Sequence, residues 1–342
     1  MRGDYPSRYR DGVTRVAVFG AGAMGTAFAM HACRLGHDTT LWATPHDARA
    51  LATLRAERRH PLLPEHLPER VRVFDADHLE EAAEGCEVAI MAANSHGARS
   101  LAEMVRPHVT EAGFAVSVAK GLEPGTGKRM SEVYGEELRG PAVVAVGGPC
   151  LAAELAGGLP TAGVWAGATR EIAAAAGEPF DDRNYQLVFT DDLAGVELSS
   201  MMKNVAAIGL GILDGLGGPV ALDYKNAKAA LFTKAAHELV ELITALGGRA
   251  ETVFGLAGIG DQLVTSLGGR NRLYGEMVGA GEPPAETLRV LEGRGLTVEG
   301  VDSTRDVLRL ATEHRLTLPY HAAIHRVLFE GADPHDILEV LR

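Results

Sequence analysis

The chain has 342 residues, of which 46% are hydrophobic and 23% charged, and its formal net charge is -12. This composition predicts globular structure, excludes disordered and fibrous classes, and provides enough residues for two domains. The negative charge argues against nucleic acid or an anionic membrane surface as the main partner, so local cations must hold any anionic ligand.

Cysteines and the chain start indicate the compartment. The three cysteines, Cys33, Cys86 and Cys150, are far apart and show neither a disulfide framework nor the spacing of metal ligands. Residues 1–12 are polar and contain no apolar segment, so we expect a loose tail and no secretory signal. The longest apolar stretch, residues 205–213, is too short to span a bilayer. We therefore expect a soluble, cytoplasmic protein without membrane insertion.

The first strong motif follows the first predicted strand. Residues 15–20 are β-rich and run into Gly20, Gly22 and Gly25, which have the G-x-G-x-x-G spacing. The first glycine permits a tight turn, the second allows backbone to approach a pyrophosphate, and the third lets the helix pack closely. Small residues after Gly25 favour a helix, whose N-terminus would hold the phosphates. The motif therefore predicts a dinucleotide site.

Residues 13–192 alternate β-rich and helical segments, which predicts a doubly wound, Rossmann-type sheet. Ligands of such sheets bind at the carboxyl ends of the strands, so we expect the glycine motif, residues 93–96, Lys120 and Gly148 to meet there. The expected strands are residues 15–20, 39–42, 71–74, 87–92, 115–119, 142–147, 163–166 and 186–189.

Residues 193–342 have few strand signals and predict an all-helical domain. Glycine clusters at residues 215–218, 247–248, 268–269 and 279–281 are interpreted as turns. The expected helices are residues 194–213, 225–246, 265–278, 284–291, 303–313 and 321–328.

One of these helices carries an unusual polar pair. Lys203 and Asn204 stand in an otherwise apolar, small-residue segment. A buried lysine without a partner loses its charge, so this lysine suggests a proton donor for a carbonyl or an alkoxide. The alternative is an amphipathic helix whose lysine reaches solvent. Together with a nicotinamide coenzyme, the first interpretation favours hydride transfer to a small carbonyl compound.

Several motifs occur in an order that resembles one family. They are residues 20–25, Lys120-Gly121, residues 148–154, Lys203-Asn204, residues 226–231, residues 255–261, Arg270-Asn271 and residues 298–300. Together they are similar to the NAD(P)-dependent sn-glycerol-3-phosphate dehydrogenases, over roughly residues 13–328. The resemblance implies a Rossmann-type domain followed by a helical substrate and catalytic domain like the C-terminal domain of 6-phosphogluconate dehydrogenase.

The resemblance also implies roles for individual residues. Lys203 would be the general acid and base, with Lys120 and Asp261 beside it; without the family match, Asp261 would be a helix N-cap. The implied substrate contacts are Lys120, Asn204, Thr265, Arg270 and Asn271, among which the arginine suits a phosphate. The implied coenzyme contacts are Gly20, Gly22, Ala23, Met24, Gly25, Thr44, Lys120, Ala152, Arg270 and Glu299.

The sequence departs from the family pattern at four places. Where the family has Trp-x-Arg after the second strand, this chain has Trp42-Ala43-Thr44; Asp47 or Arg49 could substitute, in opposite directions, so the coenzyme is NAD or NADP. Cys150 replaces a usual serine. The segment 217–225 is longer and the segment 261–270 shorter than usual, which is either surface variation or a pocket reshaped for a phosphorylated or phosphonate relative of the substrate.

These features predict an oxidoreductase that interconverts dihydroxyacetone phosphate and sn-glycerol 3-phosphate, and the family resemblance suggests a homodimer. A β-hydroxyacid dehydrogenase is one alternative, but that group has a Lys-x-x-x-Asn spacing and this chain has Ala207 at the second position. The other alternative is a dinucleotide sensor without catalysis.

Overall fold

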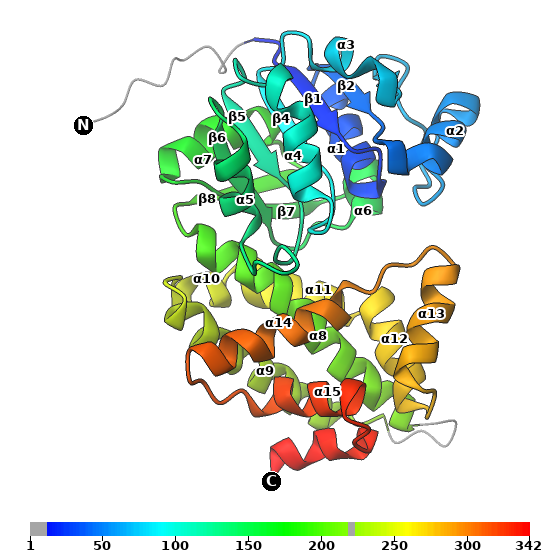
Figure 1. The fold of residues 1–342 in the computed structure, drawn as a ribbon, viewed down its shortest axis with the longest axis vertical. Helices are drawn as coiled ribbons and strands as arrows, with labels where there is room; N and C mark the ends of the chain where they lie inside the picture. Colours follow the sequence, from blue (N-terminus) through cyan, green and yellow to red (C-terminus); the bar gives the residue numbers. More distant parts are fainter. Residues whose placement is uncertain (1–11, 218–222) are drawn as a thin grey trace. The chain divides into compact units, whose positions relative to one another are not determined.

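The computed structural model describes residues 12–217 and 223–342, which form two compact units that divide after Leu193. The expected N-terminal tail, apart from its last residue, and the centre of the 217–225 segment lie outside the described residues. Figure 1 colours the first unit from blue to green and the second from green through yellow to red.

The first unit contains one eight-stranded sheet in the order β3-β2-β1-β4-β5-β6-β7-β8. Neighbouring strands are parallel except β6 and β7, which pair antiparallel, so the last two strands run against the first six. All eight predicted strands are present. They are β1 (Arg15–Phe19), β2 (Asp38–Trp42), β3 (Arg72–Phe74), β4 (Val88–Met91), β5 (Phe114–Ser117), β6 (Ala142–Gly147), β7 (Thr161–Ala166) and β8 (Tyr185–Thr190).

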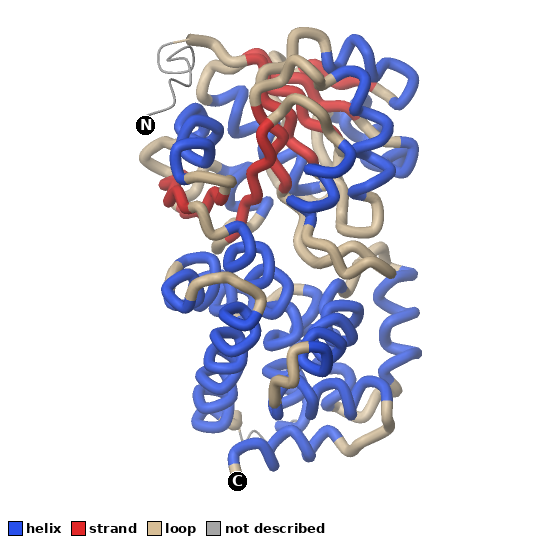
Figure 2. Tube along the Cα trace, turned by 60° about the vertical axis from the view of Figure 1, so that its left-hand side comes forward, coloured by secondary structure: helices blue, strands red, loops and turns tan. Residues whose placement is uncertain are grey.

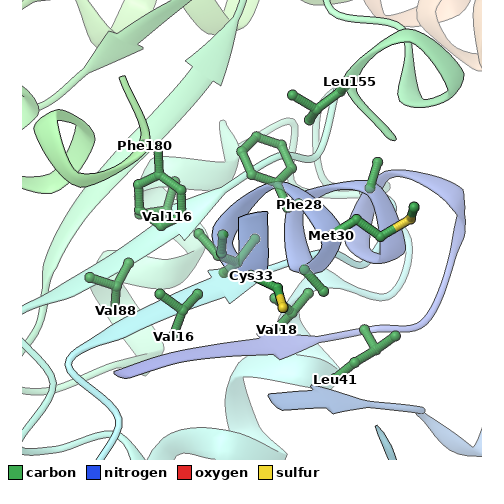
Figure 3. Packing of buried hydrophobic residues seen from close by; sticks show 14 of the residues in the cluster. Val16, Val18, Phe28, Met30, Cys33, Leu41, Val88, Val116, Leu155 and Phe180 are labelled. Atoms are coloured by element: carbon green, nitrogen blue, oxygen red, sulfur yellow. The ribbon is translucent and has the colours of Figure 1, made fainter. Parts of the chain in front are cut away.

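Helices cover both faces of this sheet. Alternation along β1 sends Val16 and Val18 into one core and Ala17 and Phe19 into the other. In the first core, Phe28 of α1 packs among side chains of the sheet and of neighbouring helices (Figure 3). The helices are α1 (Ala23–Arg34), α2 (Ala48–Glu57), α3 (Leu79–Ala83), α4 (Ala98–Val105), α5 (Met130–Glu137), α6 (Ala152–Gly157) and α7 (Arg170–Gly177), with 3-10 turns η2 (Pro45–Asp47), η3 (Ala76–His78), η4 (Arg106–His108) and η5 (Glu178–Phe180).

The second unit consists of helices joined by loops and has no strand among its described residues (Figure 2). Its central helix is α8 (Leu193–Gly217), in which every residue from Gly195 to Leu213 is buried. This helix is long and apolar enough to cross a membrane, but its apolar window is wholly buried inside the protein. The others are α9 (Lys225–Ala245), α10 (Ala250–Phe254), a π-helix η6 (Leu256–Gly260), α11 (Asp261–Ser266), α12 (Arg270–Gly279), α13 (Pro284–Gly293), α14 (Glu299–Glu313), α15 (Pro319–Phe329) and the 3-10 segment η7 (Pro334–Leu341).

Two local predictions for this unit were wrong. The expected helix 265–278 is interrupted, because α11 ends at Ser266 and α12 begins after Gly269, which has a φ of +95°. The expected turn at Gly215 is instead part of α8. Glycine there serves packing, since a Cβ on Gly215 would lie 2.1 Å from the carbonyl oxygen of Glu276.

That close packing extends along the whole contact between α8 and α12. A Cβ added to Gly211 would lie 2.1 Å from the carbonyl oxygen of Arg272, and one added to Gly275 or Gly279 would lie 2.1 Å from a carbonyl oxygen of α8. Both helices therefore use glycine pairs four residues apart, which fall on one helical face. The absence of side chains lets the two backbones touch, and this fixes the N-terminus of α12 against α8.

Candidate active site

The glycine turn of the first unit has the geometry that the motif predicted. Gly20 has a φ of +115°, and a Cβ on Gly25 would lie 2.1 Å from the Gly20 carbonyl oxygen, so neither position accepts another residue easily. Gly22 is different, because its Cβ would meet no atom within 4 Å. The turn is closed at its first and third glycines and open at its second.

The open glycine is the N-cap of α1. The helix begins with Ala23 and Met24. No side chain caps it, and its first turn holds no acidic residue. Its first N–H groups are therefore available to an anion, and the helix dipole favours negative charge at this end. The turn thus fits the pyrophosphate of a dinucleotide.

A carboxylate connects this turn to the end of β2. Asp47 Oδ2 accepts hydrogen bonds from Ala21 N at 3.1 Å, from Thr44 N at 2.9 Å and from Thr44 Oγ1 at 2.7 Å. Thr44 in turn caps the 3-10 turn η2 through its hydroxyl. The predicted coenzyme contact at Thr44 therefore lies in a hydrogen-bonded loop at the same edge of the sheet as the glycine motif.

Lys120 lies at this edge as well. It follows β5, is half-buried, and lines a small cavity together with Met24, Gly148 and Cys150. Ser95 is close by, since a Cβ on Gly121 would lie 3.2 Å from its hydroxyl oxygen. The structure thus brings together the segments that the sheet topology predicted, and Ala152 follows as the first residue of α6.

The loop that carries Lys120 is held by an ion pair. Arg99 of α4 contacts both carboxylate oxygens of Glu123, with Nε 2.6 Å from Oε1. The Arg99 guanidinium lowers the pKa of Glu123 to about 2, so this carboxylate stays charged at neutral pH. Glu123 N also donates to Lys128 O at 2.8 Å, which closes the loop. Sequence reasoning did not find Arg99, which precedes the loop by about twenty positions.

In the second unit, Lys203 is buried and paired with Asp261. Lys203 is 5% exposed and Asp261 is 1% exposed, and the Lys203 ammonium hydrogen-bonds to Asp261 Oδ1. The alternative in which the lysine reaches solvent is therefore wrong. Asp261 is the first residue of α11 and not an N-cap, because the π-helix η6 leads directly into it. Thr265 Oγ1 donates to the Asp261 carbonyl oxygen at 2.7 Å, one turn further on.

Two asparagines beside this pair bind each other. Asn271 Nδ2 donates to Asn204 Oδ1 at 3.0 Å, and Asn271 Oδ1 accepts from Gly300 N at 2.9 Å. The Gly300 N–H fixes the orientation of the Asn271 amide, and this in turn fixes that of Asn204. Asn204 Nδ2 is buried and makes no hydrogen bond within the described residues. A buried donor without a partner is costly, so this group is ready for an acceptor oxygen of a ligand.

The two arginines at the start of α12 differ in availability. Arg272 Nε donates to Asp214 Oδ2 at 2.6 Å and its Nη1 to the Ser266 carbonyl oxygen at 2.5 Å, so protein groups use it. The Arg270 side chain is 43% exposed and reaches Glu299 Oε1 at 3.2 Å. Arg270 therefore presents a guanidinium to solvent at a helix start, next to Asn271.

The predicted residues thus form two groups, one in each unit. The glycine motif, Thr44, Lys120 and Ala152 lie in the first unit, and Lys203 with its neighbours lies in the second. No cluster of three metal-ligating side chains occurs within the described parts of the chain.

Comparison with known proteins decides the family. The N-terminal family model of NAD-dependent glycerol-3-phosphate dehydrogenase matches residues 15–173, and the C-terminal model matches residues 192–339. The chain is 36% identical over 325 residues to a glycerol-3-phosphate dehydrogenase (NAD(P)+) of Thermoanaerobacter sp. (strain X514), covering 94% of each chain. The chain belongs to the NAD-dependent glycerol-3-phosphate dehydrogenase family.

Two further relatives agree over nearly the full length. A glycerol-3-phosphate dehydrogenase (NAD(P)+) of Koribacter versatilis is 37% identical over 337 residues, covering 96% of this chain and 97% of the relative. The crystal structure of glycerol-3-phosphate dehydrogenase from Coxiella burnetii matches with a TM-score of 0.84 and 30% identity, covering 96% of this chain and 98% of that one. The Rossmann-type sheet followed by a helical unit is therefore the fold of this family.

The contact of three helices, α8, α12 and α14, could not be predicted from single residues of the sequence. The Asn204–Asn271 pair joins α8 to α12, and the Gly300 backbone adds α14 to it. The glycine pairs on α8 and α12 make this contact possible. The detectable signal was the four-residue spacing of Gly211 and Gly215, repeated by Gly275 and Gly279.

Proposed function

We propose that this protein catalyses reversible hydride transfer between NAD(P)H and C2 of dihydroxyacetone phosphate, giving sn-glycerol 3-phosphate. The observation that supports this most directly is the buried Lys203–Asp261 pair, with the neighbouring Asn204 Nδ2 left without a hydrogen-bond partner among the described residues. A buried ammonium next to a free amide donor provides a proton and a hydrogen bond where an oxygen anion would form.

The chain's residues would act as follows in the direction of reduction. The glycine turn of the first unit would hold the coenzyme, whose reduced nicotinamide would supply the hydride to C2. Lys203 then gives one proton to the carbonyl oxygen, which becomes the hydroxyl of the product, and in the reverse direction the neutral amine takes that proton back. Asp261 holds the amine in place and keeps it charged before the transfer. Lys120 would add a second cation near the substrate.

The phosphate requires donors away from the reacting carbon. Arg270 has an exposed guanidinium, whose planar fork matches two phosphate oxygens. Asn271 uses one N–H for Asn204 and keeps the other for a ligand, and Thr265 lies on the preceding helix. Glu299 would keep Arg270 oriented toward the coenzyme and substrate.

A substrate screen tests this function. Oxidation of NADH and NADPH should be followed with dihydroxyacetone phosphate, its phosphonate analogue and unphosphorylated dihydroxyacetone, and reduction of NAD+ and NADP+ should be followed with a β-hydroxyacid. We expect dihydroxyacetone phosphate to be turned over at least about 100-fold more efficiently than dihydroxyacetone, because the phosphate donors stay unpaired without it.

The alternatives give different results. Preference for the phosphonate would identify a variant substrate, and turnover of the β-hydroxyacid alone would favour that dehydrogenase group. Coenzyme binding without any turnover would favour a sensor. The family resemblance also leads us to propose a homodimer, which light scattering on the purified protein tests directly.

A further inference from the structure

The end of β2 holds a feature that concerns coenzyme choice. The family pattern has an arginine there, whereas this chain has Thr44 and, three residues later, Asp47. Asp47 follows Gly25 at roughly the distance, about 20 residues, at which dinucleotide sites place the acidic group that binds the adenosine ribose. It does not end the strand, however, so its sequence position alone does not locate it.

The structure places the Asp47 carboxylate at the glycine turn. Its Oδ2 is held by Ala21 N and by both the N–H and the hydroxyl of Thr44. Three donors on one oxygen keep the carboxylate fixed at the rim between β1 and β2. Within the described residues Oδ1 accepts no hydrogen bond, so it can still accept one from a ligand hydroxyl.

The titratable groups of the same region do not neutralise this carboxylate: His60 interacts electrostatically with Asp47, but burial lowers the pKa of its ring, which favours the neutral form. Arg55 pairs with Asp75, and Arg58 donates to the Pro68 and Val71 carbonyl oxygens. Arg49 is exposed, and its guanidinium forms no hydrogen bond or ion pair with the described residues. A long, unrestrained side chain must lose conformational entropy to hold a phosphate, whereas Asp47 is already in place.

We propose that Asp47 is the specificity-determining residue for the coenzyme and makes this enzyme prefer NADH to NADPH. A ribose 2′-hydroxyl can donate to Oδ1, while a 2′-phosphate would bring about two negative charges to a fixed carboxylate. The inference rests on the proposed function, because it assumes that the glycine turn binds a nicotinamide dinucleotide.

Calorimetric titration of the full-length protein with NADH and with NADPH, without substrate, tests the inference apart from turnover. We expect NADH to bind at least about tenfold more tightly. Asp47→Asn keeps an acceptor oxygen for Ala21 and Thr44 but removes the charge, so the NADH to NADPH affinity ratio should fall, mainly through tighter NADPH binding. Asp38→Asn removes a charge at the opposite end of β2 and should leave the ratio unchanged.

Three results would overturn the inference. Equal or tighter binding of NADPH by the unmodified protein would do so, as would an unchanged ratio in Asp47→Asn. A fall in NADPH affinity in Arg49→Ala, without any effect of Asp47→Asn, would move the determinant to Arg49. If Asp47 were only structural, Asp47→Asn would lower the melting temperature without moving the ratio. Turnover of dihydroxyacetone phosphate in any of these cases would leave the proposed function intact.

Discussion

The two units use glycine for opposite purposes. In the first unit, Gly22 leaves open space in a backbone turn, and the site is made of N–H groups around it. In the second unit, Gly211, Gly215, Gly275 and Gly279 remove the space between two helices, and the site is made of buried polar side chains that the close packing brings together. A surface for a coenzyme can thus be made by omitting side chains, whereas a proton donor requires side chains in contact.

The largest effect is expected from the side-chain site. Lys203→Met should reduce turnover by about 10²- to 10⁴-fold, because no other group gives the proton. It should also destabilise the fold by about 3–5 kcal/mol, since Asp261 stays buried without its partner. The double variant Lys203→Met with Asp261→Leu should regain most of the stability and none of the turnover. Steady-state kinetics and urea unfolding measure both effects.

A matched control uses a lysine of the same unit. Lys225, whose side chain is 83% exposed, should tolerate replacement by Met with no change in kinetics or stability. Turnover within about tenfold of normal in folded Lys203→Met would remove this residue from the mechanism.

The helix contact should show the next largest effect. In Gly275→Ala, the new methyl would collide with a backbone carbonyl of Ile208 that has no rotamer to change. We expect a loss of about 3 kcal/mol in the free energy of unfolding, at the upper end of overpacking costs. Gly293→Ala in α13 meets no atom within 4 Å and should be neutral or slightly stabilising. Equal stability of the two variants would contradict the proposed role of the glycine pairs.

In the glycine turn, substitution of the second glycine should affect coenzyme binding and not the stability of the fold. Gly22 has φ -69° and ψ 175°, which any residue adopts, so Gly22→Ala should fold normally. Its methyl would fill the space of the pyrophosphate and weaken coenzyme binding by about tenfold or more. Titration with NADH measures this, and Gly135→Ala, which is equally unobstructed in α5, should bind as the unmodified protein does. Undiminished affinity in Gly22→Ala would show that the phosphates lie elsewhere.

The smallest effect is expected from a buried histidine. His31 Nε2 lies 2.7 Å from the Phe180 carbonyl oxygen and its Nδ1 faces Arg34, an arrangement that suits the neutral ring. Burial lowers the pKa of His31 below the ordinary histidine value of 6.5. The unfolded chain therefore binds the proton more readily, and stability should fall as pH drops below about 6.5, by at most about 1.4 kcal/mol per pH unit.

Replacement isolates this contribution. His31→Gln keeps an N–H for the Phe180 carbonyl but does not titrate. Between about pH 5 and 7, where histidine ordinarily changes its charge, the urea midpoint of this variant should depend less on pH than that of the unmodified protein. An identical pH dependence in both proteins would assign the effect to another group.

The sequence predicted the first unit well because its information is local. Most strands are short runs rich in apolar and β-branched residues, and the glycine motif specifies a turn that needs glycine at positions 20 and 25. The reversed direction of β7 was not predicted, since strand sequences do not encode which way a neighbour runs. In the second unit, α8 was recognisable and the glycines at 268–269 were interpreted as a turn, but the helix expected over 265–278 extended across that turn, whereas the structure has two helices there.

The buried polar contacts of the second unit could not be predicted from the sequence, for a different reason. Asn271 and Asn204 were each expected at the substrate, but their mutual hydrogen bond depends on how two helices dock. Glu238 was not singled out at all, although its carboxylate accepts from Tyr320 N at 2.8 Å and His321 N at 3.1 Å and so caps α15. Pairs separated by 67 to 83 positions leave no local pattern. The functional roles of all these residues stay predictions.

The π-helix η6 before Asp261 has a consequence for how this enzyme can be inactivated. Each wide turn holds one residue more than an α-helical turn, and one residue corresponds to about 100° of rotation around a helix axis. Loss of any single residue from Leu256–Gly260 would therefore swing the Asp261 carboxylate around the axis, out of reach of its lysine. Deletion of one residue from this segment would therefore abolish activity, although every side chain proposed to act in catalysis would still be present.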